Sequence, residues 1–354
     1  MPVTVRSFAK INLGLGIGAL RADGFHELRT VYQTMALHDV IRMSVGRGSG
    51  IEIRCEDSRV PKDESNTCYR IVERAMVALK ARGRVVVEIE KRLPVQGGLG
   101  GASGNAVAAL LALERSLKKE LSGPERLRIA AEVGSDLPLF LVGGTVLGVG
   151  RGEEVYPLPD LPAMPCVVAT PEIGVSTPKA FADWDLLVAN AAELCSAWTG
   201  EGARPHVSLG DPKLTLHAGS DRMGEFGRVL SAWLGSQSQG KLKSGRASAS
   251  SGVPVSKGRG RAGNPLLDLV RTGIENDFEQ VVFPKYPELR EVKSVLVRTG
   301  AVYASLSGSG SATYGLFASR TAAEKAAARL RKDGIPAAAT TTLTRPLYWK
   351  KIFD

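Results

Sequence analysis

Cysteine is rare in this sequence, and its arrangement excludes several kinds of site. The chain has 354 residues and four cysteines, Cys55, Cys68, Cys166 and Cys195, and none of them forms a Cys-x-x-Cys pair. The four histidines show no metal-ligand spacing either. This pattern argues against a zinc site or a disulfide framework and favours reduced cysteines buried in a cytoplasmic protein.

Long apolar runs are also missing. No uninterrupted apolar segment is long enough to cross a membrane, and the first residues lack the basic-then-apolar layout of a signal peptide. Apolar residues make up 44% of the chain and charged residues 23%, which is typical of globular proteins. The length allows two domains, which we expect at residues 1–160 and 161–354.

Aromatic residues are absent from the most basic segment. Residues 236–262 are rich in Ser and Gly, and their six Lys and Arg residues supply more than half of the net charge of +10. Such a segment has little to bury, so we expect a solvated, flexible insert. Non-specific RNA binding is the alternative. Without aromatic residues for base stacking, the composition argues against nucleic acid as a partner.

The most informative stretch is a glycine-rich loop at residues 94–106. It follows a strand-like run at residues 84–90 and leads into an expected helix, where Ser103 or Asn105 could cap the first turn. Missing Cβ atoms let backbone N–H groups approach a phosphate chain, and the helix dipole adds a positive end. We predict nucleotide binding; the ordinary alternative is a turn where a helix packs close to a sheet. The residues expected to bind the nucleotide are Pro94, Val95, Gln96, Gly97, Gly98, Leu99, Gly100, Gly101, Ala102, Ser103 and Gly104.

The commoner nucleotide motifs are missing or weak. A P-loop would end in Gly-Lys-Ser/Thr, but here Gly104 is followed by Asn105. A dinucleotide fingerprint occurs at residues 14–19, with Asp39 about twenty residues later. The Asp-Gly pair at residues 23–24 predicts a turn that would break the helix this fingerprint requires. A Rossmann dehydrogenase therefore remains only a minor alternative.

The order of expected elements is typical of an α+β protein. Strands are expected at residues 4–15, 40–45, 51–55, 84–90, 166–170, 303–306 and 312–317, with an apolar hairpin at residues 139–147. Helices are expected at residues 66–82, 103–119, 123–133, 222–234, 276–282, 287–298 and 321–332, and from residue 177 onward. Strand pairs and separate helices argue against a doubly wound parallel sheet.

Three separated motifs resemble the signature motifs of the GHMP kinases. They are Ser-Phe-Ala-Lys-Ile-Asn-Leu at residues 7–13, the glycine-rich loop, and Leu-Ser-Gly-Ser-Gly-Ser at residues 306–311. The resemblance implies a two-domain GHMP kinase-like architecture. It also implies an ATP-dependent phosphotransferase that uses Mg²⁺ and has an alcohol as acceptor.

Further runs narrow the resemblance to one branch of this family. They lie at residues 21–28, 134–140, 150–153 and 275–279. This branch implies transfer of the γ-phosphate of ATP to the 2-hydroxyl of a cytidine diphosphate-linked methylerythritol, in the non-mevalonate route to isoprenoid precursors. The alternatives are a GHMP small-alcohol kinase of the homoserine or mevalonate type and, from a different class, a basic RNA-binding protein.

The resemblance also assigns two catalytic residues. It marks Asp136 as the base for the hydroxyl proton, although a lone Asp in this setting would otherwise be interpreted as a turn or cap residue. Lys10 lies in an apolar strand-like run, where a buried lysine requires a carboxylate partner. An Asp136–Lys10 pair is therefore expected, and a surface lysine on an edge strand is the alternative.

Substrate-binding residues follow from the same resemblance. It suggests that His26 hydrogen-bonds the cytosine edge, that Phe25 and Phe181 sandwich the ring, and that Asn66 lies near the adenine. The phenylalanines could instead belong to the core, and Asn66 could be a helix cap. The glycine cluster at residues 307–311 is either a second phosphate- or substrate-facing loop or a tight turn between strands.

Two positions depart from the family pattern. Gly104 stands where a second serine is usual, so one hydroxyl near the phosphates or metal is missing. Phe8 stands where proline is usual, which affects backbone rigidity rather than chemistry.

Overall fold

The computed structural model describes residues 2–198 and 275–353, with side chains up to residue 190 in the first range. The helix expected at residues 222–234 and the basic insert at residues 236–262 lie outside the described residues, as does the Cys195 side chain. The other three cysteines are free and buried, as the sequence predicted. Burial raises the pKa of Cys68 to about 12, which keeps it a thiol. None of the helices in the described part combines the length and the apolar composition that a membrane span requires.

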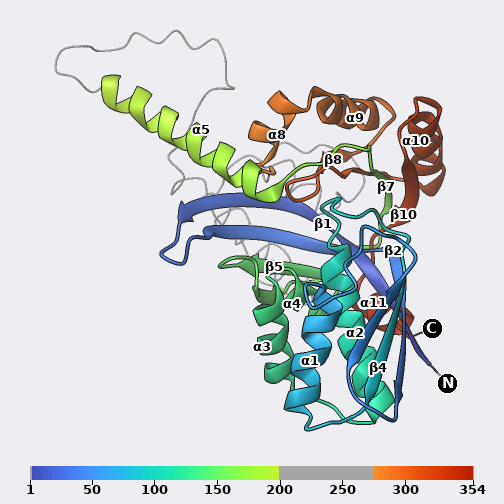
Figure 1. The fold of residues 1–354 in the computed structure, drawn as a ribbon. Helices are drawn as coiled ribbons and strands as arrows, with labels where there is room; N and C mark the ends of the chain where they lie inside the picture. Colours follow the sequence, from blue (N-terminus) through green and yellow to red (C-terminus); the bar gives the residue numbers. More distant parts are fainter. Residues whose placement is uncertain (1, 199–274, 354) are drawn as a thin grey trace, which may run out of the picture.

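Two long antiparallel strands organise the molecule (Figure 1). They are β1 (Val3–Leu20) and β2 (His26–Gly46), and the turn between them contains the predicted Asp-Gly pair. The other strands are β3 (Ile51–Cys55), β4 (Arg84–Glu90), β5 (Thr145–Val149), β6 (Glu154–Pro157), β7 (Pro165–Ala169), β8 (Tyr303–Leu306), β9 (Thr313–Leu316) and β10 (Ala337–Thr341). The helices are α1 (Thr67–Ala78), α2 (Gly101–Leu117), α3 (Gly123–Val133), α4 (Leu137–Val142), α5 (Thr177–Trp198), α8 (Glu279–Lys285), α9 (Pro287–Arg298), α10 (Arg320–Lys332) and α11 (Arg345–Lys351).

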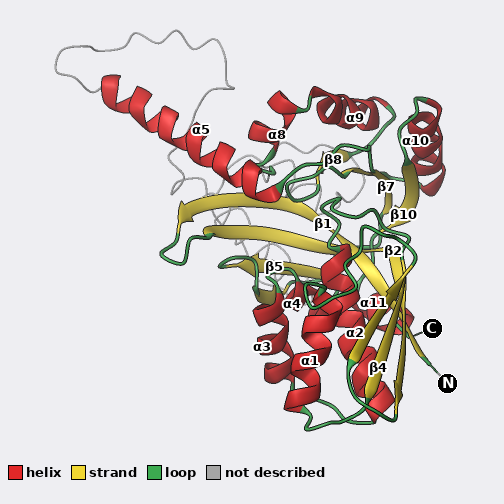
Figure 2. Ribbon diagram, viewed as in Figure 1, coloured by secondary structure: helices red, strands yellow, loops and turns green. Residues whose placement is uncertain are grey.

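Within the described residues, these strands form two sheets (Figure 2). The first has the order β3-β4-β2-β5-β6, with β1 paired to β2, and only its β3–β4 pair is parallel. The second has the order β10-β7-β9-β8 and is antiparallel throughout. Mostly antiparallel sheets with helices packed against them confirm the predicted α+β class.

The core lies in layers on both sides of β1 and β2. Helices α1 to α4 pack on the first sheet, and α9 and α10 pack on the second (Figure 1). A further cluster joins the two sheets, where Ile11 and Leu13 of β1 meet Val168 and Tyr314. β1 is thus buried without interruption from Ser7 to Leu15, and this run includes the polar residues Lys10 and Asn12.

The prediction of an apolar hairpin at residues 139–147 is wrong. Its first half is helix α4, and only its second half is a strand, β5. A short apolar run fits a buried helix as well as a strand, and here Pro138 at the helix start favours the helix. Gly143 and Gly144 then end it with φ values of 68° and 71°.

The end of the chain returns to the first sheet. Tyr348 and Ile352 pack into the core beneath that sheet, and the Arg6 backbone N–H donates to the Ile352 carbonyl over 2.8 Å. The C-terminal helix α11 therefore completes the core of the first sheet. A domain boundary near residue 160 stays a prediction.

Candidate active site

The glycine-rich loop lies between β4 and α2, as expected, and lines a cavity of about 370 Å³. Every predicted nucleotide-binding residue from Pro94 to Ser103 lines it, together with Asn66. The predicted cap is wrong, because α2 begins at Gly101 and places Ser103 and Asn105 inside the helix. The N-cap is Gly100, whose φ of 69° is favourable only for glycine.

Gly104 is the one predicted nucleotide-binding residue that does not line this cavity. A Cβ at this position would come within 2.9 Å of both the Phe8 carbonyl oxygen and the Ser7 Oγ. The serine usual in the family therefore has no room here. The close approach of α2 to β1 explains why this chain carries glycine.

The second glycine cluster clamps the loop. Residues 307–311 form the turn between β8 and β9, and the Ser307 hydroxyl donates to the Gly98 carbonyl over 2.9 Å. The Ala312 N–H donates to the Gly97 carbonyl over 3.1 Å, and Gly308 lines a neighbouring cavity. The cluster is thus a strand-to-strand turn that also contacts the glycine-rich loop.

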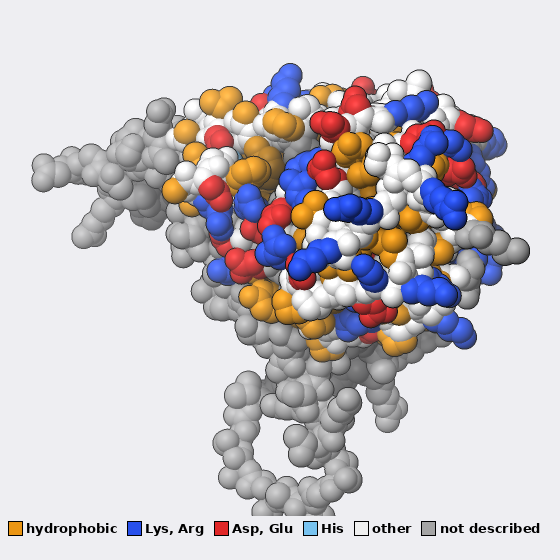
Figure 3. All heavy atoms as spheres, turned by 60° about the horizontal axis from the view of Figure 1, so that its bottom comes forward, with side chains coloured by type: hydrophobic (Ala, Val, Ile, Leu, Met, Phe, Trp, Pro, Cys, Tyr) orange, Lys and Arg blue, Asp and Glu red, His pale blue; other side chains and the backbone are white. Residues whose placement is uncertain are grey.

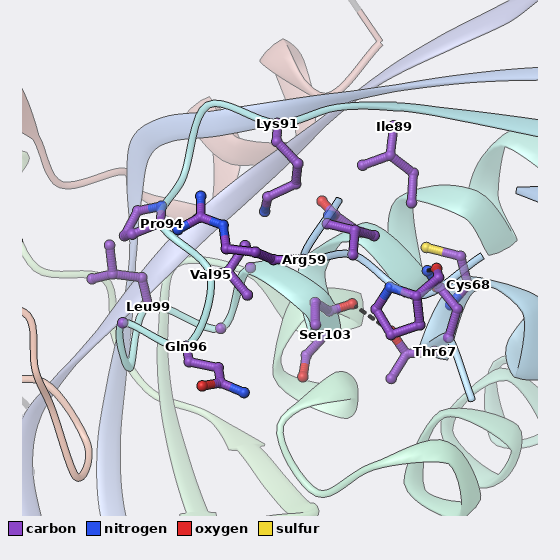
Figure 4. A pocket seen from close by; sticks show the side chains of 18 of the residues that line it. Arg59, Thr67, Cys68, Ile89, Lys91, Pro94, Val95, Gln96, Leu99 and Ser103 are labelled. Atoms are coloured by element: carbon purple, nitrogen blue, oxygen red, sulfur yellow. Dashed lines mark hydrogen bonds between the residues drawn. The ribbon is translucent and has the colours of Figure 1, made fainter. Parts of the chain in front are cut away.

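A buried ion pair supports the start of the loop. Lys91 pairs with the fully buried Asp39, which also accepts the backbone N–H groups of Arg92 and Leu93 over 2.7 and 2.8 Å. Asp39 therefore anchors the segment before the loop, and the dinucleotide interpretation that used it is wrong, since residues 14–19 lie inside β1. Figure 4 shows the Lys91 side chain directed toward the cavity, with Ser103 of α2 also at its lining.

A second cavity of about 610 Å³ meets the first at Gly98 and Gly100. Lys10 and Asp136 both line it, and the Lys10 Nζ lies 3.3 Å from the Asp136 Oδ2 and 2.7 Å from the Asn12 Oδ1. Lys10 is 3% exposed, so the expectation of a buried lysine with a carboxylate partner is confirmed. Asp136 occupies the N-cap position of α4, yet its carboxylate turns toward Lys10.

Tyr32 holds the other side of the Asp136 carboxylate. Its hydroxyl donates to the Asp136 Oδ1 over 3.1 Å, and the Lys10 Nζ lies 5.6 Å from the centre of its ring. Burial, together with the negative charge of Asp136, raises the pKa of Tyr32 well above its usual value. The phenol therefore stays protonated and acts as a hydrogen-bond donor.

Three predicted substrate-binding residues gather at the far end of this cavity. The His26 imidazole stacks on the Phe181 ring with centroids 4.9 Å apart, and its Nε2 lies 2.7 Å from the Asp185 Oδ1. The exposed Phe25 ring carries the Arg151 guanidinium 5.0 Å above its centre. His26 thus covers one face of Phe181, and Phe25 remains open to the cavity.

Asn66 serves as a cap and as a cavity residue at once. Its Oδ1 accepts the Cys68 N–H over 2.8 Å at the start of α1, and its Nδ2 donates to the Pro61 carbonyl over 2.6 Å. It also lines the first cavity. Both interpretations of this residue therefore agree with its position.

Comparison with known proteins decides the family. A 4-diphosphocytidyl-2-C-methyl-D-erythritol kinase of Solibacter usitatus is 34% identical over 329 residues, covering 93% of this chain and 85% of that protein. The enzyme of the same name from Nocardia farcinica is 31% identical over 354 residues, covering 100% of this chain and 97% of that protein. The chain belongs to the 4-diphosphocytidyl-2-C-methyl-D-erythritol kinase family.

Domain and structure comparisons place this family among the GHMP kinases. The GHMP kinases N terminal domain matches residues 66–144, and the GHMP kinases C terminal domain matches residues 263–335. A crystal structure of 4-(cytidine 5'-diphospho)-2C-methyl-D-erythritol kinase superposes with a TM-score of 0.65 at 28% identity, covering 96% of this chain and 98% of that one. A homoserine kinase from Cytophaga hutchinsonii, at 19% identity and a TM-score of 0.63 over 97% and 95% of the two chains, shares the fold. The chain is an ATP-dependent phosphotransferase with the GHMP kinase fold.

Four residues of the kinase site were missed from the sequence. Asn12 and Tyr32 hold Lys10 and Asp136, Lys91 lines the loop cavity, and Asp185 holds His26. The spacing of Asn12, two residues after Lys10 in one strand, places both side chains on the same face and was a usable signal. For Asp185, 159 residues from its partner, the sequence offered none.

Proposed function

We propose that this kinase transfers the γ-phosphate of ATP to the 2-hydroxyl of 4-diphosphocytidyl-2-C-methyl-D-erythritol. The observation that carries the proposal is the junction of the two cavities at Gly98 and Gly100. A nucleotide in the first cavity would direct its terminal phosphate at this junction, where the Lys10–Asp136 pair lines the second cavity. The identity of the substrate is inferred from the names of the relatives.

The proposed chemistry uses Asp136 as a general base. The carboxylate accepts the proton of the substrate hydroxyl while the hydroxyl oxygen attacks the γ-phosphorus. The bond between the γ-phosphorus and the bridging oxygen breaks, and ADP leaves. Lys10 faces the Asp136 carboxylate and offers positive charge to the phosphoryl group as negative charge develops on it. The backbone N–H groups of the loop cradle the phosphates.

Nucleotide and metal would share the first cavity. We assign Asn66 to the neighbourhood of the adenine and the loop residues to the phosphates. Among the described residues no group of three or more His, Cys, Asp or Glu could hold a metal ion. Mg²⁺ commonly keeps few protein ligands and binds through nucleotide phosphates, so the Ser103 hydroxyl and those phosphates would hold it here. The ion would neutralise charge on the transferred phosphoryl group.

The cytidine base would occupy the far end of the second cavity. Phe25 and Phe181 provide aromatic surface and His26 a ring nitrogen for hydrogen bonding. The three free buried cysteines agree with the cytoplasmic location that we also propose. The division into domains at residues 1–160 and 161–354 remains part of the same proposal.

A substrate panel tests the proposal directly. ATP consumption is measured with 4-diphosphocytidyl-2-C-methyl-D-erythritol, homoserine and mevalonate, and only the first should support turnover. On the face that Figure 3 shows, Lys and Arg side chains are interspersed with Asp and Glu, which does not favour the alternative of RNA binding. Tight, steeply salt-dependent RNA binding without kinase activity would support that alternative.

Replacing His26 with alanine should weaken base selection. The wild-type enzyme should prefer the cytidine substrate over its uridine analogue, because unpaired polar groups cost about 1–3 kcal/mol each. The H26A variant should narrow this preference and raise KM more than it lowers kcat, because the base lies far from the reacting hydroxyl. The measurement is kcat/KM for both substrates in both proteins. If the wild type shows no preference, the assignment of this cavity to cytosine is wrong.

A further inference from the structure

The Asp136 carboxylate is held at one oxygen by Lys10 of β1 and at the other by Tyr32 of β2. Asn12 of β1 lies directly opposite Tyr32 of β2 in the strand register. Asn12 accepts a hydrogen bond from Lys10, whose ammonium approaches the Asp136 Oδ2, while the Tyr32 hydroxyl donates to the Asp136 Oδ1. One cross-strand pair therefore supports both catalytic side chains.

Asp136 needs this support because its position alone does not fix it. The residue lies at a helix end, and its side chain is 34% exposed to the cavity. Lys10 contacts one carboxylate oxygen only, so rotation about the Cβ–Cγ bond would otherwise remain open. A donor on the second oxygen fixes the carboxylate plane and still leaves lone pairs for a substrate hydroxyl.

Two glycines make room for the Tyr32 side chain. A Cβ on Gly152 would lie 2.5 Å from the Tyr32 Oη, and a Cβ on Gly148 of β5 would lie 2.5 Å from its Cε2. Gly152 also has a φ of 99°, which favours glycine. Gly152 belongs to the Gly-Arg-Gly-Glu run at residues 150–153, whose sequence carried part of the family resemblance.

We propose that Tyr32 is a positioning residue for the catalytic base and that Gly148 and Gly152 form its seat. The inference rests on the proposed role of Asp136. It assigns to the Gly-Arg-Gly-Glu run a physical purpose, which is to keep the phenol within hydrogen-bond distance of the carboxylate. Because Tyr32 acts through Asp136, its removal should affect the chemical step rather than the binding of ATP.

Replacing Tyr32 with phenylalanine removes only the hydroxyl. We expect kcat to fall about 10- to 100-fold, the effect of losing one hydrogen bond to a charged group, with the KM for ATP within about twofold of wild type. Tyr348→Phe is the matched control, because Tyr348 is equally buried and donates to the Phe140 carbonyl over 2.7 Å in the core beneath the first sheet. The kcat of Tyr348→Phe should stay unchanged, while its melting temperature should fall by about as much as that of Tyr32→Phe.

Double variants separate positioning from general loss of structure. In an Asp136→Asn background, Tyr32→Phe should lower kcat by less than about twofold further, because there is no base left to position. Gly152→Ala should lower kcat more in the wild type than in the Tyr32→Phe background, where the Oη that lies 2.5 Å from the added Cβ is gone and only the backbone strain at a φ of 99° remains.

An unchanged kcat in Tyr32→Phe overturns the inference. It is also overturned if Tyr32→Phe lowers kcat by the same factor in the Asp136→Asn background as in the wild type. If Asp136→Asn alone retains normal turnover, the proposed role of Asp136 fails and the positioning role fails with it. If Asp136→Asn is inactive while Tyr32→Phe is normal, the function stands and only the positioning role is overturned.

Discussion

Asp136→Asn is expected to lower kcat by about 10²- to 10⁴-fold while ATP still binds, which is the usual contribution of a positioned general base. Asparagine has nearly the same shape and can still accept a hydrogen bond from Tyr32 at its Oδ1. It cannot accept the substrate proton, and it removes the charge that faces Lys10. The substitution should therefore lower turnover and leave the binding of ATP in the first cavity unchanged.

The test compares kcat at saturating substrate with the Kd for ATP in the same protein. Asp183→Asn is the control, because Asp183 of α5 pairs with Lys285 of α8 over 2.5 Å and does not line the second cavity. The control should keep wild-type turnover. Turnover near the wild-type value in Asp136→Asn would remove this carboxylate from the mechanism.

The parts of the site that depend only on residues close together in the sequence could be predicted. The glycine-rich loop followed by a helix needs only neighbouring residues, and its position between β4 and α2 is confirmed. That Lys10 has a carboxylate partner could be predicted because a buried ammonium in an apolar strand requires one, whereas the choice of Asp136 came from the family resemblance. Both inferences depend on energetic costs that hold wherever the chain folds.

Tyr32 could not be found in this way, because the first half of β2 was not recognised as a strand. Residues 30–35 are all buried, since the first sheet has helices on one face and the second sheet on the other. The alternation of polar and apolar residues that marks a half-buried strand is therefore absent there. Their polar members, among them Thr30 and Gln33, are paired with partners far along the chain, such as the Leu343 carbonyl.

The cap of α2 was mispredicted for a related reason. Ser103 and Asn105 are residue types that commonly cap helices, but Gly100 takes the cap position with a left-handed backbone. A side chain at Gly100 would meet the Lys10 Cγ and the Phe140 Cζ at 2.9 Å each. Tertiary packing against Lys10 and Phe140, rather than local capping preference, fixes where the helix begins.

The same packing predicts a large effect for Gly98→Ala. A Cβ at this position would lie 2.2 Å from the Ser307 carbonyl oxygen, and the φ of 74° is unfavourable for alanine. The Ser307 turn cannot move away easily, because the Asn276 Nδ2 holds its Leu306 and Gly308 carbonyls over 2.9 and 2.7 Å. Backbone strain and overpacking together should destabilise the fold by about 2–4 kcal/mol.

The displaced loop should also lose its phosphate cradle. We expect kcat/KM for ATP to fall at least about 100-fold in Gly98→Ala, because in the proposed mechanism the backbone N–H groups of this loop bind the phosphates. Gly123→Ala is the matched control: Gly123 begins α3, and its Cβ would enter open space, so that variant should keep its activity and be as stable as wild type or more so. Thermal unfolding and ATP titration measure both effects. A normal Kd for ATP in Gly98→Ala would contradict the assignment of the phosphates to this loop, because a Cβ 2.2 Å from the Ser307 carbonyl oxygen forces the loop or the turn to shift.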